Sequence, residues 1–125
     1  MNSVKNFINK PNKLVINTFD KVFIIDADNI IHCEAVNNYT RFHLDNGEDI
    51  LAAKTLSKFE NLLAKTENFI RVHRSHLINI NHIKSFSKGD KCIIYMSNNQ
   101  TVPYSVDKRK ILQGLLSIDI LQEDK

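Results

Sequence analysis

The chain of 125 residues is long enough for one domain with a core of its own, and its 42% hydrophobic and 25% charged residues are ordinary values for a globular protein. No apolar run is long enough for a membrane span or a signal peptide, and Cys33 and Cys92 stand isolated, so we expect a cytoplasmic protein without disulfides or cofactors. The net charge of +3 is concentrated in residues 69–113, where eight Lys or Arg face two acids, and this predicts a polyanionic partner such as nucleic acid.

The first half of the chain is expected to be mainly β-strand. Residues 1–13 are polar and rich in Asn and Lys, which is typical of a linker or an N-terminal tail. Alternating apolar and polar residues, separated by Asp, Asn and Gly turns, then predict five strands, at residues 14–19, 22–25, 30–36, 39–44 and 48–53. In the fourth strand, Thr40, Phe42 and Leu44 would share one face, while Arg41 and His43 would face solvent.

The period of the apolar residues changes after the fifth strand. Three leucines and one phenylalanine between residues 56 and 63 recur at helical spacing, which predicts an amphipathic helix over residues 55–65 with Thr55 as its N-cap. Further strands are expected at residues 83–87, 92–96 and 100–104. Ser105 would cap a terminal helix, and residues 119–125 would form a frayed acidic tail.

Between these parts lies a basic stretch, residues 69–86, with the sequence FIRVHRSHLININHIKSF. Apolar residues alternate with Arg71 and His73 at its start, the pattern of a half-buried strand. Ser75 can accept a backbone N–H bond as a helix cap, so we expect SHLIN to form one helical turn. Core residues on both flanks would hold the corner from Arg74 to His76 stiffly, so that it presents a guanidinium and two imidazoles to a partner.

Two other chemical interpretations of this stretch are disfavoured. His73 and His76, with His82 further on, have no Cys or paired carboxylate nearby in sequence, which argues against a metal site. Ser75 lies between two histidines, but adjacent residues rarely form a catalytic triad and no G-x-S-x-G motif is present. We therefore expect no enzymatic activity and no catalytic residues.

Four segments resemble the LytTR-type DNA-binding domain, the output module of many bacterial response regulators. They are IIHCEAVNNYTRFHL, the amphipathic helix, FIRVHRSHLININHIKSF and TVPYSVDKRKIL, in the family's order. The resemblance implies a domain over residues 14–118 with a mostly-β (α+β) fold: about ten short strands in antiparallel sheets, one internal amphipathic helix and a C-terminal helix. It also implies that loops, rather than a recognition helix, contact the DNA.

Carried over residue by residue, the family's DNA-contacting positions fall in a turn between strands, in the basic corner and after the last strand. The residues at these positions are Asn38, Tyr39 and Thr40; His73 and Arg74; and Ser105, Lys108 and Arg109. Arg presents a planar donor fork that matches guanine O6 and N7, and Asn can pair with adenine. Family members often have a basic residue soon after the serine, whereas this chain has Val106 and Asp107 before its three basic residues.

The expected function is sequence-specific duplex DNA binding in bacterial transcriptional regulation. The chain would be the output domain of a two-component response regulator, with loop residues that read major grooves at promoter repeats. An upstream receiver domain or sensor kinase is an expected partner, and the chain alone would be a monomer or weak dimer. The alternative is a non-enzymatic interaction module whose basic face binds RNA or an acidic protein.

Overall fold

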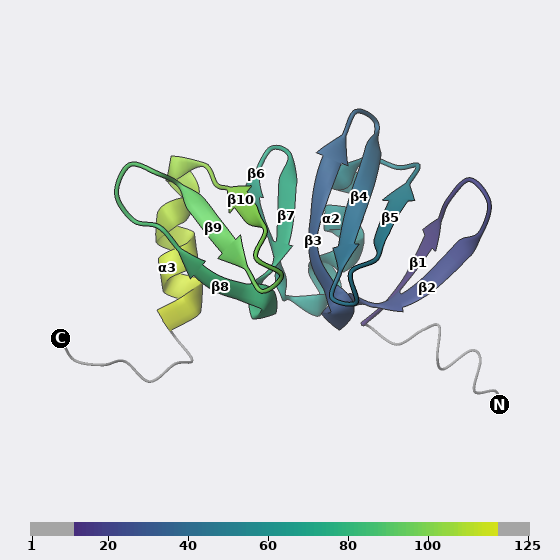
Figure 1. Cartoon of the computed structure of the whole chain (residues 1–125), viewed down its shortest axis with the longest axis horizontal. Coiled ribbons are helices and arrows are strands. Elements are labelled where there is room, and N and C mark those ends of the chain that lie inside the picture. Colours follow the sequence, from purple (N-terminus) through teal and green to yellow (C-terminus); the bar gives the residue numbers. More distant parts are fainter. Residues whose placement is uncertain (1–11, 118–125) are drawn as a thin grey trace.

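The computed structural model describes residues 12–117, in which ten strands form three antiparallel sheets (Figure 1). The central sheet has the strand order β5 (Asp49–Ala52), β4 (Tyr39–Leu44), β3 (Ile30–Val36), β7 (His76–Asn79) and β6 (Phe69–His73). The smaller sheets are formed by β1 (Lys13–Asn17) and β2 (Val22–Asp26), and by β8 (Ile83–Phe86), β9 (Ile93–Met96) and β10 (Thr101–Pro103). The predicted mostly-β fold class is confirmed.

Two α-helices and four short 3-10 helices complete the described part of the chain. They are η1 (Ala27–Asn29), α2 (Leu56–Leu63), η2 (Ala64–Thr66), η3 (Ile80–His82), η4 (Val106–Lys108) and α3 (Arg109–Ser117). The internal and the terminal helix are thus confirmed close to their expected positions. Thr55 and Ser105 occupy the predicted N-cap positions, Ser105 at the start of η4, which leads into α3, although neither side chain makes a capping hydrogen bond.

The predicted tails lie almost wholly outside the described residues. The exceptions are Asn12 and Lys13 of the predicted N-terminal linker: Asn12 lies in a turn, and Lys13 belongs to β1. The acidic tail over residues 119–125 falls entirely beyond the part of the chain that the structure describes. Within that part, no helix is long and apolar enough to cross a membrane.

Two hydrophobic clusters cover the two faces of the central sheet. On one face α2 and the β1–β2 hairpin pack on residues such as Phe42, whose ring meets Phe59 of α2 edge-on with 4.8 Å between ring centres. On the other face the three-stranded sheet and α3 pack on Ile78, with Met96 and Leu112 fully buried. Burial of one such side chain contributes about 1.5–3 kcal/mol, so the two clusters fix the central sheet from both sides.

The basic stretch differs from the prediction in one element. SHLIN does not form a helical turn, because His76–Asn79 are strand β7, paired with β3 on one side and with β6 on the other. The two ladders use the backbone groups that a helical turn would need, so tertiary pairing decides the local structure. Ser75 instead forms, with Arg74, the two-residue turn between β6 and β7.

His43 also differs from the prediction. It points away from the face that carries Phe42, as strand alternation requires, yet only 6% of His43 is exposed. Its ring stacks on that of His32 on β3 with 4.3 Å between ring centres, and Glu34 lies against it. The prediction of a solvent-facing His43 is therefore wrong, because side chains of the neighbouring strand cover the ring.

Candidate nucleic-acid interface

The three segments predicted to contact DNA lie along one edge of the molecule, at the top of Figure 1. The β3–β4 and β6–β7 turns are joined there by the N–H of Ala35, which donates to the carbonyl of Ser75 at 2.9 Å. The chain that enters η4 is joined to β6 by the N–H of Ser105, which donates to the carbonyl of Val72 at 2.8 Å. We call residues 37–39, 73–75 and 105–109 together the loop edge.

The loop edge is wide enough for more than one DNA groove. Adjacent strands lie about 4.8 Å apart, so the distance from β4 across β3 and β7 to β6 is about 14 Å, and the Ser105 segment adds about one more spacing. The minor groove of B-DNA is about 6 Å wide and the major groove about 12 Å. A row of about 19 Å is therefore about as long as the two groove widths together.

Arg74 is the exposed residue of the β6–β7 turn, and its backbone is fixed from several sides. Its carbonyl accepts a hydrogen bond from Nη2 of Arg71 at 2.6 Å, and the carbonyl of His73 accepts one from Nε of Arg71 at 3.0 Å. The N–H of Ser75 donates to Nδ1 of His73 at 3.0 Å. These bonds hold the base of the Arg74 side chain in one direction while the residue itself stays exposed.

Arg71 is a positioning residue that the sequence analysis did not single out. Besides the two turn carbonyls, it binds Glu60 of α2, with Nη1 donating to Oε1 at 2.6 Å. Only 22% of the Arg71 side chain is exposed, against 42% for Glu60. The bonds to the turn span two and three residues and were accessible to local reasoning, whereas nothing in the sequence pairs this strand with the helix.

His73 has one ring nitrogen, Nε2, that is not bonded within the turn. Its Nδ1 accepts the Ser75 N–H, so in the neutral ring the proton resides on Nε2. That N–H is a donor at the loop edge, suited to a phosphate oxygen or a guanine acceptor. His76 is paired with His73 across the hairpin and is half-buried, and burial lowers the pKa of its imidazole. His76 therefore adds little positive charge at neutral pH.

The β3–β4 turn exposes two of its three predicted contact residues. Asn37 closes the turn at a φ of 57°, a conformation that Asn tolerates, and the next two residues, Asn38 and Tyr39, are exposed. Thr40 is completely buried, and its hydroxyl donates to the carbonyl of Lys54 at 2.8 Å. The Thr40 side chain thus acts inside the fold, which corrects its prediction as a direct contact.

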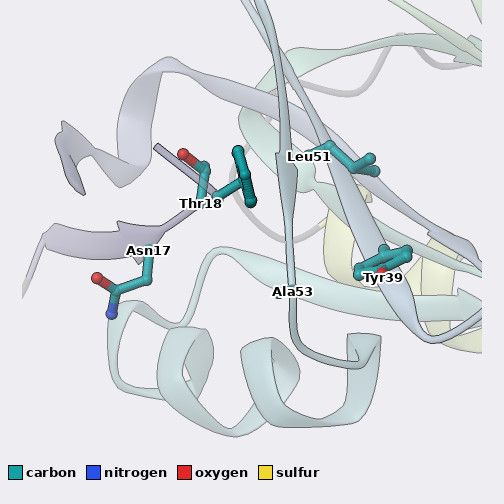
Figure 2. Close-up of a pocket in the computed structure, with 6 residues that line it drawn as sticks. Asn17, Thr18, Tyr39, Leu51 and Ala53 are labelled. Atoms are coloured by element: carbon teal, nitrogen blue, oxygen red, sulfur yellow. The ribbon is translucent and has the colours of Figure 1, made fainter. Parts of the chain in front are cut away.

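Tyr39 also borders an apolar hollow beside the loop edge. Figure 2 shows the hollow between Tyr39 and Leu51 of the central sheet and the end of β1, where Asn17 and Thr18 lie. Its volume is about 380 Å³. Beside this hollow, 46% of Tyr39 is exposed.

The third segment combines outward-facing residues with one that is bonded into the fold. Asp107 is exposed beside the half-buried Lys108, so the carboxylate offsets part of the positive field there. Arg109 donates through Nε to the hydroxyl of Tyr104 at 3.0 Å and through Nη2 to the carbonyl of Gly89 at 2.6 Å. Arg109 thereby fastens the β8–β9 loop to α3, and its contact with a phosphate stays a prediction.

This geometry agrees with three comparisons. The sequence matches the family model of the LytTr DNA-binding domain over residues 20–117. A solved LytTr DNA-binding domain, described as part of a methyl-accepting/DNA response regulator from Bacillus cereus, has a TM-score of 0.70 and 27% identity, covering 86% of this chain and 98% of that one. The CO-responsive transcriptional regulator RcoM of Rhodospirillum rubrum is 29% identical over 97 residues, 75% of this chain and 40% of that regulator's length. The chain belongs to the LytTR family of DNA-binding domains.

Proposed function

We propose that the chain binds duplex DNA sequence-specifically and that its loop edge reads bases in neighbouring grooves. The observation that carries this proposal is the anchored turn, where an exposed Arg74 stands on a backbone held by Arg71 and His73. Two parallel hydrogen bonds to O6 and N7 of guanine require a guanidinium with a fixed direction. A phosphate contact is less demanding, since a flexible cation can make it from many angles.

The exposed side chains of the loop edge divide into base readers and backbone contacts. Arg74 would read a guanine, and the Asn38 amide would read an adenine from the adjacent turn. Phosphates and sugars would be contacted by the remaining exposed or half-buried groups of the edge: Tyr39, His73, Ser105 and Lys108. Thr40 would act indirectly, and Arg109 would also hold its segment in place.

The basic charge alone would attract duplex DNA, RNA or an acidic protein. Shape favours the first, because a row of about 19 Å matches the spacing of B-form grooves. The major groove of an A-form RNA helix is deep and narrow, and side chains cannot read it. RNA or an acidic protein remains the second candidate, supported by the excess of positive charge in residues 69–113.

We further propose that the chain serves as the output domain of a bacterial two-component regulator. The two relatives are described as a response regulator and a CO-responsive transcriptional regulator, and the chain spans 40% of the second one's length. A receiver domain or a sensor kinase would then control this domain in the bacterial cytoplasm. Each promoter repeat would bind one copy, and the free chain would be a monomer or weak dimer.

Selection from a library of random duplexes tests this function directly. Repeated binding and sequencing should enrich a motif whose affinity exceeds that of random DNA by at least about 10³-fold. Affinity for the motif should also fall steeply with salt, because bound Lys and Arg release counterions from phosphates. Absence of an enriched motif, or equal competition by RNA of the same sequence, would favour the interaction-module alternative.

A further inference from the structure

A cluster of titratable side chains lies on the β3–β4 hairpin, toward the end away from its turn and on the face of the central sheet opposite α2. His32 and His43 face each other in register, and their rings stack with 4.3 Å between centres and 15° between planes. Oε1 of Glu34 lies 2.7 Å from Nε2 of His43. A register shift between Ile30 and His32 accompanies this arrangement, as a β-bulge does when it redirects a side chain.

The donor atoms of this cluster are nearly close enough to share one ion. One atom from each of His32, Glu34 and His43 lies within 4.8 Å of the other two. At the usual zinc–nitrogen and zinc–oxygen bond lengths, tetrahedral ligand atoms lie about 3.4 Å apart. Side-chain shifts of about 1 Å therefore suffice. The Glu34 side chain, 33% exposed, has room to make such a shift without a change in the backbone.

His32 keeps an unpaired ring nitrogen inside the fold. Only 3% of His32 is exposed, and its Nδ1 is buried without a hydrogen-bond partner. Burial, together with the neighbouring imidazoles of His43 and His76, lowers the pKa of His32 to about 3.

Asp49 supplies a carboxylate behind His43. Its Oδ1 lies 3.1 Å from Nδ1 of His43, although the two groups are not aligned as a hydrogen bond. Metal-ligating histidines usually donate their second ring N–H to such a carboxylate. If Nε2 of His43 bound an ion, the ring proton would reside on Nδ1, and a small rotation would align it with Asp49. Glu34 and Asp49 would then balance the charge of a divalent ion.

We propose that His32, Glu34 and His43 form a binding site for a late divalent transition-metal ion, with zinc as its representative. Two imidazoles and one carboxylate suit this class of ion, whereas magnesium and calcium prefer oxygen ligands alone. Water would fill the remaining position on the side where Glu34 is exposed. The ion would cross-link β3 and β4 below the turn that carries Asn38 and Tyr39, and so stabilise that part of the loop edge.

Two other arrangements compete with this site. Glu34 and His43 already form a hydrogen-bonded pair that could be complete without an ion. His73 and His76, with 5.4 Å between ring centres, offer a second pair of imidazoles at the β6–β7 turn. The experiment has to distinguish the proposed site from both.

Calorimetric titration of zinc chloride into the tag-free, chelator-treated chain provides the first measurement. We expect one zinc ion per chain, and cobalt(II) chloride should give the visible absorption of a low-symmetry, four-coordinate ion. Glu34→Gln retains a hydrogen-bond acceptor for His43 and removes the carboxylate, so it should weaken zinc binding about tenfold or more. His73→Asn is the matched control, because its amide oxygen can accept the Ser75 N–H while one imidazole is lost.

Imidazole nitrogen NMR spectra of the wild-type chain give a second measurement that needs no variant. On addition of zinc, the ring signals of His32 and His43 should shift and those of His73 should not. Absence of saturable zinc binding would overturn the proposal and leave the hydrogen-bonded pair. Binding that survives Glu34→Gln unchanged, or that is lost in His73→Asn, would also overturn it and move the ion to the β6–β7 turn.

Discussion

Replacement of Arg71 by lysine tests whether the hydrogen bonds of Arg71 hold the turn that carries Arg74. Arg71 donates two hydrogen bonds to the turn carbonyls and one to Glu60, and a lysine ammonium cannot reach all three acceptors in the same geometry. Each lost bond is worth about 0.5–1.5 kcal/mol net. Because the side chain is 22% exposed and lysine keeps the charge, we expect Arg71→Lys to lower the free energy of unfolding by about 1–2 kcal/mol.

Arg71→Lys should also weaken binding to the selected motif more than binding to random duplex. A loosened turn leaves the Arg74 guanidinium without a fixed direction, so affinity for the selected motif should fall about tenfold, whereas affinity for random duplex should change less than about twofold. Urea denaturation followed by circular dichroism gives the stability, since the chain has no tryptophan. Fluorescence anisotropy with labelled duplexes gives both affinities.

Glu60→Gln is the matched control, because it removes the ionic partner of Arg71 and leaves both turn carbonyls bonded. It should cost less stability than Arg71→Lys and change the affinity for the motif only slightly. If Arg71→Lys leaves the ratio of motif to random affinity unchanged, the turn does not depend on Arg71, and the reasoning is wrong.

Three further outcomes are expected. Thr40→Val should lower the free energy of unfolding by about 1–2 kcal/mol in urea, because the Lys54 carbonyl loses its partner; an unchanged midpoint would contradict this. Lys108→Gln should reduce the slope of log affinity against log salt by about one unit on motif and random duplex alike, and an unchanged slope would exclude a phosphate contact. Iodoacetamide should modify the half-buried Cys92 in the native chain well before Cys33. Cys33 is fully buried, and burial raises the pKa of its thiol. Equal labelling of the two cysteines, measured by mass spectrometry, would contradict that burial.

Periodicity and turn chemistry predicted most of the fold. The alternation over residues 30–36 and 39–44, and the change to helical spacing at Leu56, correspond to β3, β4 and α2. SHLIN was misassigned because a serine that suits a helix cap also suits a two-residue hairpin turn. Only the pairing of β7 with β6 and with β3 decides between the two, and β3 lies far away in sequence.

The interface was predictable only in part. The resemblance identified the three segments, but not which of their side chains are used inside the fold. Burial of Thr40 depends on the carbonyl of Lys54, and the bonds of Arg109 depend on Tyr104 and Gly89. Such contacts join separate elements, so no local pattern contains them.

The pairing of His32 with His43 in the β3–β4 hairpin could have been predicted from the sequence. A two-residue turn at Asn37 and Asn38 pairs Val36 with Tyr39, and counting outward along both strands places His32 opposite His43. The position of the turn therefore predicts this pairing, whereas the alternation of apolar and polar residues alone does not. The approach of Glu34 and Asp49 to the same ring required the structure.

The most direct test of base reading by the loop edge is Arg74→Lys. This change keeps the charge and removes the donor fork on an exposed residue, so folding should be unaffected. We predict a loss of about 1–3 kcal/mol in binding to the selected motif and a much smaller loss on random duplex, measured by anisotropy at one salt concentration. An equal loss on both duplexes, or no loss on either, would contradict the account and make Arg74 only a part of the basic field.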